Sequence, residues 1–179
     1  MYIKINQILE SSQVQGPGKR FTVWVQGCSI HCLGCNNKDT WATEGGELIS
    51  TKDLIDRVIE SQSSGLTITG GEPLDQLDAI LELTQGIFSS KNIFLCSGYT
   101  FETIRKDLKK KEILNSIDII CAGPFDQSQV CQSEWKGSKN QEVISVSERG
   151  LQLLNLPVYK REYRIDKKTG NTLVTGFSV

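Results

Sequence analysis

The chain has 179 residues with 20 basic and 21 acidic side chains, which gives a formal net charge of −1. This near-balance gives no indication of nucleic acid or an anionic membrane as a main partner. No apolar run reaches the roughly 20 residues that a membrane span needs, and the N-terminus lacks the apolar segment of a secretory signal. We therefore expect a single cytoplasmic domain over residues 1–179, long enough to bury a sizeable core.

Strands and helices are predicted to alternate along most of the chain. The expected strands are residues 2–9, 21–25, 66–69, 92–96, 117–121 and 143–146. The expected helices begin near Ser50, at Leu74 and at about residue 101, the last ending at about residue 114. Strand, turn and helix recur roughly every 25 residues, which is typical of βαβ units with a parallel sheet. Because the units are too few to close an eight-stranded barrel, we expect an α/β fold with an incomplete barrel.

The C-terminal stretch departs from this rhythm. Two runs that favour strands, residues 158–165 and 172–179, flank the sequence Lys167-Lys-Thr-Gly170-Asn171. Polar and glycine residues between two such runs predict a β-hairpin.

Three cysteines, Cys28, Cys32 and Cys35, lie within eight residues in a C-x3-C-x2-C pattern. They directly follow the predicted strand 21–25, at the carboxyl end where α/β proteins build their sites. Thiolates this close repel one another and need a soft multivalent cation, which leaves zinc or an iron–sulfur cluster. A closed zinc site would need His31 or Cys96 as a fourth ligand. Three thiolates alone suit a cubane cluster with one iron left open.

A second motif, Gly70-Gly71-Glu72-Pro73, follows the predicted strand 66–69. Two glycines permit close main-chain approach and positive φ, and exposed main-chain groups can hydrogen-bond a zwitterionic ligand. An ordinary strand-to-helix turn is the alternative for this motif taken alone.

The other cysteines, Cys96, Cys121 and Cys131, are not spaced for a second cluster. Cys96 and Cys121 end apolar strands, so we interpret them as small buried side chains. His31 is interpreted as a loop residue.

The C-x3-C-x2-C loop resembles that of the radical S-adenosylmethionine (SAM) enzymes. Three stretches more narrowly resemble the activating proteins of anaerobic ribonucleoside-triphosphate reductases, and the resemblance covers residues 1–150, so that residues 151–179 form an extension. Like those activators, and unlike many radical SAM enzymes, the chain has a glycine, Gly34, directly before the third cysteine. The three stretches are residues 16–41, 66–73 and 135–141.

The resemblance implies a [4Fe-4S] cluster held by Cys28, Cys32 and Cys35, and SAM bound at its open iron. It places Gly34 and Asn36 against the adenine, and the motif Gly70, Gly71, Glu72 and Pro73 at the SAM amino group, with Cys35 counted in both sites. It implies an incomplete barrel and no catalytic residue separate from the cluster.

The implied activity is that of a radical SAM oxidoreductase. Such an enzyme cleaves SAM reductively and generates a glycyl radical on a large partner, the anaerobic ribonucleotide reductase, with a flavodoxin-like electron donor. One alternative is a radical SAM enzyme acting on a peptide or small molecule. Another is a non-enzymatic iron–sulfur or zinc module in a larger complex.

Overall fold

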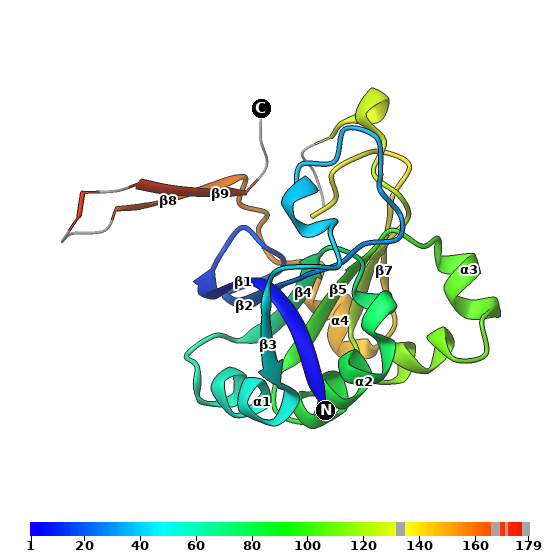
Figure 1. Ribbon diagram of the computed structural model, residues 1–179, viewed down its shortest axis with the longest axis horizontal. Helices are drawn as coiled ribbons and strands as arrows, with labels where there is room; N and C mark the ends of the chain where they lie inside the picture. The colour runs from blue at the N-terminus through cyan, green and yellow to red at the C-terminus, as the bar shows by residue number, and fades with distance from the viewer. Residues whose placement is uncertain (132–134, 166–168, 171, 177–179) are drawn as a thin grey trace.

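The structure, a computed structural model, describes residues 1–131, 135–165, 169–170 and 172–176. Its centre is a seven-stranded sheet in the order β3-β1-β2-β4-β5-β6-β7 (Figure 1). These strands are β1 (Tyr2–Ser12), β2 (Arg20–Val25), β3 (Glu47–Ser50), β4 (Gly65–Gly70), β5 (Asn92–Ser97), β6 (Ile119–Ala122) and β7 (Glu142–Ser145).

The four central strands of this sheet, β2, β4, β5 and β6, pair parallel. β1 pairs antiparallel with β2 and with β3, and β7 pairs antiparallel with β6. A mixed α/β fold with a parallel centre is therefore confirmed. The sheet places the carboxyl ends of β2, β4, β5 and β6 side by side, as expected for a site built on the loops at that end.

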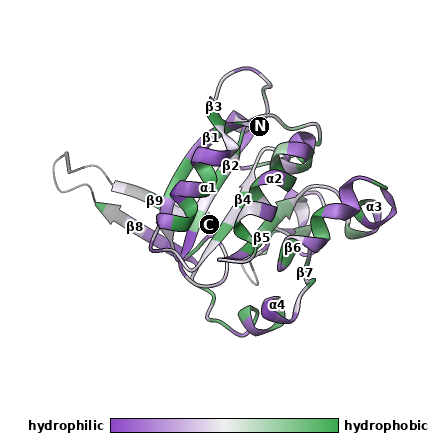
Figure 2. Ribbon diagram, turned by 90° about the horizontal axis from the view of Figure 1, so that it is seen from below, coloured by the Kyte–Doolittle hydropathy of each residue, from purple (hydrophilic) through white to green (hydrophobic). Residues whose placement is uncertain are grey.

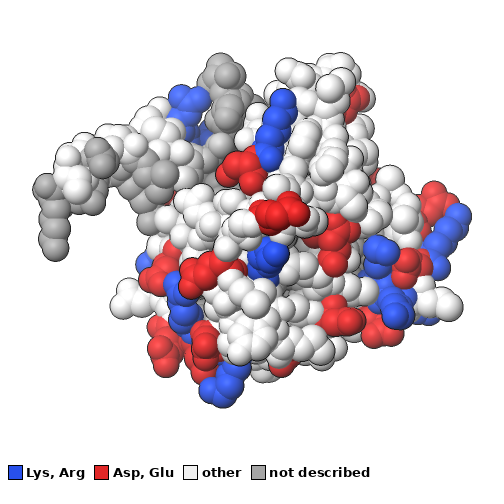
Figure 3. Space-filling model, viewed as in Figure 1, with Lys and Arg blue, Asp and Glu red and all other residues white. Residues whose placement is uncertain are grey.

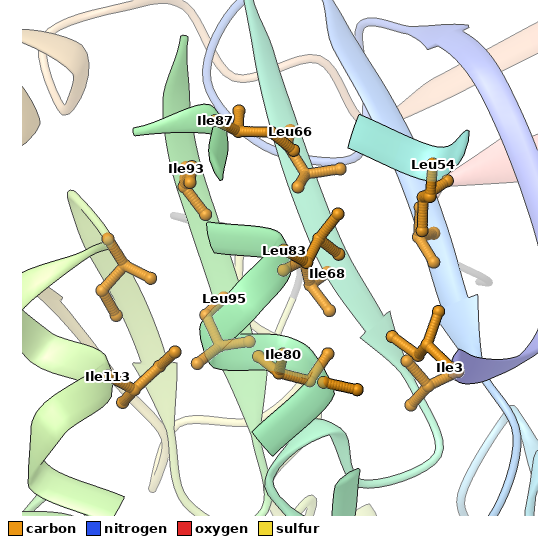
Figure 4. Close-up of a cluster of buried hydrophobic side chains, with 14 of the residues drawn as sticks. Ile3, Leu54, Leu66, Ile68, Ile80, Leu83, Ile87, Ile93, Leu95 and Ile113 are labelled. Atoms are coloured by element: carbon orange, nitrogen blue, oxygen red, sulfur yellow. The ribbon is translucent and has the colours of Figure 1, made fainter. Parts of the chain in front are cut away.

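The helices are α1 (Thr51–Glu60), α2 (Leu77–Ile87), α3 (Phe101–Lys106) and α4 (Glu148–Leu153), with short 3-10 helices η1 (Lys38–Thr40), η2 (Pro73–Gln76), η3 (Lys110–Asn115) and η4 (Gln127–Gln129). Both α1 and α2 carry hydrophilic as well as hydrophobic residues, as Figure 2 shows. Their apolar sides pack on one face of the sheet, where Leu54, Ile80 and Leu83 belong to the same unexposed cluster as Leu66 and Ile68 (Figure 4). This burial is the main favourable contribution to folding.

The predicted helix start at Ser50 is confirmed. The Ser50 side chain accepts a hydrogen bond from the main-chain N–H of Asp53, which satisfies one of the free donors in the first helical turn. Leu54 and Val58, one turn apart, are fully buried on the sheet side.

The prediction of one helix from about residue 101 to 114 is wrong. The chain leaves the helical conformation at Asp107, which is extended with φ −76° and ψ 124°. The Asp107 carboxylate accepts hydrogen bonds from the main-chain N–H groups of Lys109 and Lys110, each at 2.9 Å, and from the Lys110 ammonium at 3.0 Å. These bonds compete with helix continuation, so α3 ends at Lys106 and η3 follows.

The C-terminal strands β8 (Arg161–Ile165) and β9 (Thr172–Gly176) pair antiparallel and form a separate two-stranded sheet. In Figure 1 they extend to one side of the body. The Glu162 carboxylate ties them to the end of β1, because it accepts hydrogen bonds from the Ser12 hydroxyl at 3.0 Å and the Gln13 N–H at 3.1 Å. Part of the predicted connection and the last three residues of the expected second strand lie outside the described residues. Among the described residues, no helix is long and apolar enough to cross a membrane.

Candidate active site

The cysteine loop begins where β2 ends, and main-chain hydrogen bonds to a neighbouring segment fix its start. The N–H of Gly27 donates to the carbonyl of Thr40 at 2.8 Å, and the N–H of Cys28 donates to that of Trp41 at 3.2 Å. The buried side chain of Gln26 reaches the same segment and donates to the carbonyl of Ala42 at 2.7 Å. The residues after the third cysteine therefore fold back and position the first one.

Cys28, Cys32 and Cys35 are free cysteines on this loop. Burial raises the pKa of the Cys28 thiol. Burial also raises the pKa of Cys32, and the neighbouring charges of Cys35 and Cys28 raise it further because like charges repel. Within the described part of the chain, no three His, Cys, Asp or Glu side chains are already grouped to hold a metal ion. The cysteine ligand set therefore stays a prediction, supported by the chemistry of its donors.

The residues around the third cysteine lie in two different environments: Gly34 packs against a neighbouring segment, and Cys35 and Asn36 line a cavity. Gly34 has φ +76°, and a Cβ there would meet the side chain of Gln127, so glycine is required by conformation and by packing. The N–H of Asn37 lies 3.4 Å from the Cys35 sulfur and donates to it. Cys35 and Asn36 line a cavity of about 420 Å³.

The glycines of the second motif pack directly against β2 and the start of the cysteine loop. A Cβ on Gly71 would lie 2.0 Å from the carbonyl oxygen of Gly27, and one on Gly70 would lie 2.6 Å from the main-chain nitrogen of Val25. The N–H of Glu72 donates to the Gly27 carbonyl at 2.9 Å. The close approach that two glycines permit is thus realised within the protein itself, and the contact of this motif with SAM stays a prediction.

The Glu72 side chain is buried and points to neighbouring main chain. One carboxylate oxygen accepts from the N–H of Leu74 at 2.9 Å and from the Ser97 hydroxyl at 2.9 Å, and the other accepts from the N–H of Gly98 at 2.7 Å. Burial raises the pKa of Glu72 to about 7, although these three hydrogen bonds lower it. Glu72 therefore links the ends of β4 and β5. Pro73 is buried at the first position of η2, where its missing N–H costs nothing.

The 420 Å³ cavity lies on the other face of the sheet from α1 and α2, and its size is within the range of small-molecule sites. The strands contribute Trp24, Thr67, Thr69, Phe94, Cys96 and Cys121 to its wall, the cysteine loop contributes Cys35 and Asn36, and later segments contribute Phe125, Trp135, Gln141 and Thr175. The cavity is therefore lined both by the end of the cysteine loop and by the C-terminal strand β9. Gly34 and residues 70–73 do not line it.

Cys96 and Cys121 are register partners on β5 and β6. Cys121 is buried as predicted, and Cys96 is only partly buried. The neighbouring Cys96 thiol and burial raise the pKa of Cys121 well above its ordinary value.

The His31 ring stacks on Trp41 with ring centres 4.7 Å apart, consistent with its interpretation as a loop residue. Figure 3 shows few charged side chains over the upper end of the molecule, where the cysteine loop and the segment around Phe125 lie.

Sequence reasoning missed Asp75, which holds the cysteine loop from the other side. Its carboxylate accepts from the N–H of Ser29 at 2.7 Å and from the Ser29 hydroxyl at 2.8 Å, and the hydroxyl of Tyr99 lies 3.4 Å away. The only signal in the sequence was its place two residues after the Gly-Gly-Glu-Pro motif. Thr175 was also missed as a cavity residue.

Known proteins share this chain's sequence over most of its length. Residues 14–144 match the family described as a 4Fe-4S single cluster domain. The anaerobic ribonucleoside-triphosphate reductase-activating protein of Enterobacteria phage T4 is 34% identical over 140 residues, which cover 74% of this chain and 87% of the relative. The protein of that name from Vibrio cholerae is 34% identical over 142 residues, covering 73% and 90%.

Among solved structures, QueE from Escherichia coli is similar with a TM-score of 0.46 and 22% identity, over 56% of this chain and 54% of that chain. The sequence relatives are the stronger match, because identity above 30% extends over most of both chains. The chain belongs to the family of anaerobic ribonucleoside-triphosphate reductase-activating proteins and carries its 4Fe-4S single cluster domain.

Proposed function

We propose that this protein is a radical SAM oxidoreductase that generates a glycyl radical on an anaerobic ribonucleotide reductase. The observation that carries the proposal is the position of the three-cysteine loop. It stands at the carboxyl end of β2, and its third cysteine opens into a 420 Å³ cavity. The relatives that share this chain's sequence over most of its length are named as activators of that reductase.

The donor set fits a [4Fe-4S] cluster better than zinc. Three free thiols lie on one loop, and the histidine of that loop is stacked on Trp41. Cys96, the other candidate fourth ligand, lies in the strand wall beside Cys121. Cys28, Cys32 and Cys35 would hold the cluster, and the N–H of Asn37 would tune it through its bond to the Cys35 sulfur.

A bound cluster and SAM together supply one-electron reductive cleavage of SAM, which yields a hydrogen-abstracting 5′-deoxyadenosyl radical. The chain's own residues orient these groups. We propose that Gly34, Cys35 and Asn36 lie along the SAM adenine, and that residues 70–73 offer main-chain groups to its amino group. Glu72 then acts by holding the loop at Ser97 and Gly98 in place.

The proposed architecture follows from the same cavity. We propose that the sheet curves into an incomplete barrel around it, that β8 and β9 form a hairpin, and that residues 1–150 form the core of one domain with 151–179 as its extension. An open barrel leaves the cysteine loop accessible to a macromolecular substrate. Six free cysteines suit a reducing cytoplasm.

A flavodoxin-like donor is proposed as the source of electrons. The remaining cysteines, Cys96, Cys121 and Cys131, do not form a metal-binding group within the described residues, so no second centre for internal electron supply is visible there.

The test is activation of the purified cognate reductase under anaerobic conditions. The protein, SAM and a strong reductant should give a doublet electron paramagnetic resonance signal on the large subunit. Deuterium placed on the partner's glycine should appear in 5′-deoxyadenosine.

Cys35→Ala should abolish both signals, and Cys131→Ala is the matched control that should keep them. SAM cleavage without any signal or deuterium transfer would instead indicate a peptide or small-molecule substrate. Absence of SAM cleavage in an iron-loaded protein would indicate a non-enzymatic cluster module.

A further inference from the structure

Two residues that line the cavity each have a buried polar side-chain atom with no hydrogen-bond partner among the described residues. The atoms are Nε1 of Trp135 and Oγ1 of Thr175. Trp135 is only 6% exposed. In the described part of the chain, only one other buried side-chain nitrogen or oxygen lacks a hydrogen-bond partner, and it is Oγ1 of Thr22. An unpaired buried polar group is costly, so native proteins rarely keep one without a ligand or water to satisfy it.

The two residues come from separate segments that the fold brings to the same cavity. Trp135 has φ +57°, which is unusual for a large side chain. Thr175 is on β9, opposite Glu162 of β8. Because Glu162 is bonded to Ser12 and Gln13, this face of the two strands is fixed against the body. Two residues that line the cavity, on separate elements, thus carry an indole N–H donor and a threonine hydroxyl that have no partner within the described residues.

We propose that Trp135 and Thr175 form a peptide-binding subsite, which holds the main chain of the glycine-bearing segment of the reductase. This proposal rests on the proposed function. A glycine has no side chain, so a protein can recognise it only through its main-chain amides. A main-chain carbonyl would accept from the Trp135 N–H, and a threonine hydroxyl can either donate to a carbonyl or accept from an N–H. Cys35 lines the same cavity, which places the held segment next to the cysteine loop.

The test uses two substitutions that remove the unpaired polar groups. Thr175→Val replaces the hydroxyl with a methyl group and keeps the shape of the side chain, whereas Trp135→Phe removes the indole N–H together with part of the buried ring. Thr172→Val makes the same change at an exposed position of β9 that does not line the cavity. Purified full-length proteins are compared for radical formation on the purified cognate reductase at varied concentration.

We expect each cavity variant to raise the KM for the reductase roughly three- to tenfold, with kcat nearly unchanged, because one neutral hydrogen bond is lost in binding. The midpoint of thermal unfolding of free Thr175→Val should stay equal or rise, since no bond is lost in the free protein and an unpaired polar group is removed. Trp135→Phe should lower the midpoint, because part of a buried ring is lost. Thr172→Val should match the parent in KM.

Three results would overturn the subsite. The first is an unchanged KM for both cavity variants while the parent protein activates the reductase. The second is a weaker affinity for SAM measured without reductase, which would assign the two groups to SAM. The third is a lower unfolding midpoint for Thr175→Val, which would mean that the Thr175 hydroxyl was already bonded within the chain. A parent protein that forms no radical on the reductase would instead overturn the proposed function, and the subsite with it.

Discussion

Asp75 and Ser29, which are 46 residues apart, are joined by two hydrogen bonds to one carboxylate. Ser29 directly follows the first cysteine of the loop, and Asp75 belongs to η2, which directly follows β4 and Gly71-Glu72. The carboxylate therefore fixes the direction in which the loop leaves Cys28.

Removing this carboxylate should loosen the cysteine loop with little effect on overall stability. We expect Asp75→Ala to lower the free energy of unfolding by only about 1 kcal/mol, because both bonds are exposed to solvent. The reconstituted variant should lose iron to a chelator several-fold faster than the parent. Asp78→Ala, at an exposed acidic residue near the start of α2, is the control. Equal rates of iron loss for Asp75→Ala and Asp78→Ala would show that the two bonds do not hold the loop.

The loop cysteines should differ from the other cysteines in iron binding. The parent, reconstituted without oxygen, should contain about four irons and four sulfides per chain. Cys28→Ala, Cys32→Ala and Cys35→Ala should each abolish this content, whereas Cys96→Ala, in the wall of the cavity, should keep it. Iron and acid-labile sulfide are measured chemically. Tightly bound zinc without sulfide in the parent would contradict the cluster.

Gly71→Ala should affect iron and SAM together. Its new Cβ would collide with the main-chain carbonyl of Gly27. Because Gly27 directly precedes Cys28, its main chain cannot move away without displacing that cysteine. We expect a loss of about 1–3 kcal/mol in the free energy of unfolding, as for other overpacked sites. Gly137→Ala is a milder control, because its nearest neighbour is the Phe125 ring at 3.0 Å. A Gly71→Ala protein that matched the parent in stability, iron content and SAM affinity would contradict the close contact.

Glu72 should make stability fall as pH rises. Its pKa is raised by burial to about 7, above the ordinary value of 4.5, so the folded protein binds more protons than the unfolded chain between these values. The free energy of unfolding should therefore decrease by about 3 kcal/mol as pH rises from about 4.5 through 7. Urea unfolding of the metal-free protein at several pH values measures this decrease.

Glu72→Gln should remove most of that pH dependence, because glutamine does not titrate. Asp75→Asn, with an exposed carboxylate replaced, should retain it. If the parent and Glu72→Gln had parallel pH profiles, another group would have to account for the decrease.

The parallel strands were predictable because their composition reflects burial on both faces. Phe21, Val23 and Val25 share one face of β2, Leu66 and Ile68 share one face of β4, and all five are unexposed. Thr22 and Thr67, which point to the opposite face, are also buried. Runs of apolar and threonine residues buried on both faces are typical of central parallel strands. The strand β3 was missed because Ile49 is its only buried residue. The helix α4 was missed because it has only six residues and one of them, Gly150, disfavours helix formation. That glycine is explained by a contact distant in sequence, since a Cβ there would lie 2.2 Å from the Asp118 carbonyl oxygen.

The predicted site residues share one region because their motifs are local in sequence. The contacts that hold them are not local. Asp75 reaches Ser29, Gln127 packs against Gly34, and Thr175 shares a cavity with Cys35. Each of these depends on how β-strands and loops far apart in the chain are brought together, which hydrophobic periodicity does not encode.

The direct contact between Gly27 and the Gly71–Glu72 segment has a consequence for how the protein opens. Three main-chain bonds, from Gly27 to Thr40, from Gly71 to Val25 and from Glu72 to Gly27, run through one small region without any side chain between them. Opening any one of them displaces the others, so their amide hydrogens would exchange with deuterated solvent as one cooperative unit. The two loops would then be protected together or released together, rather than breathing independently.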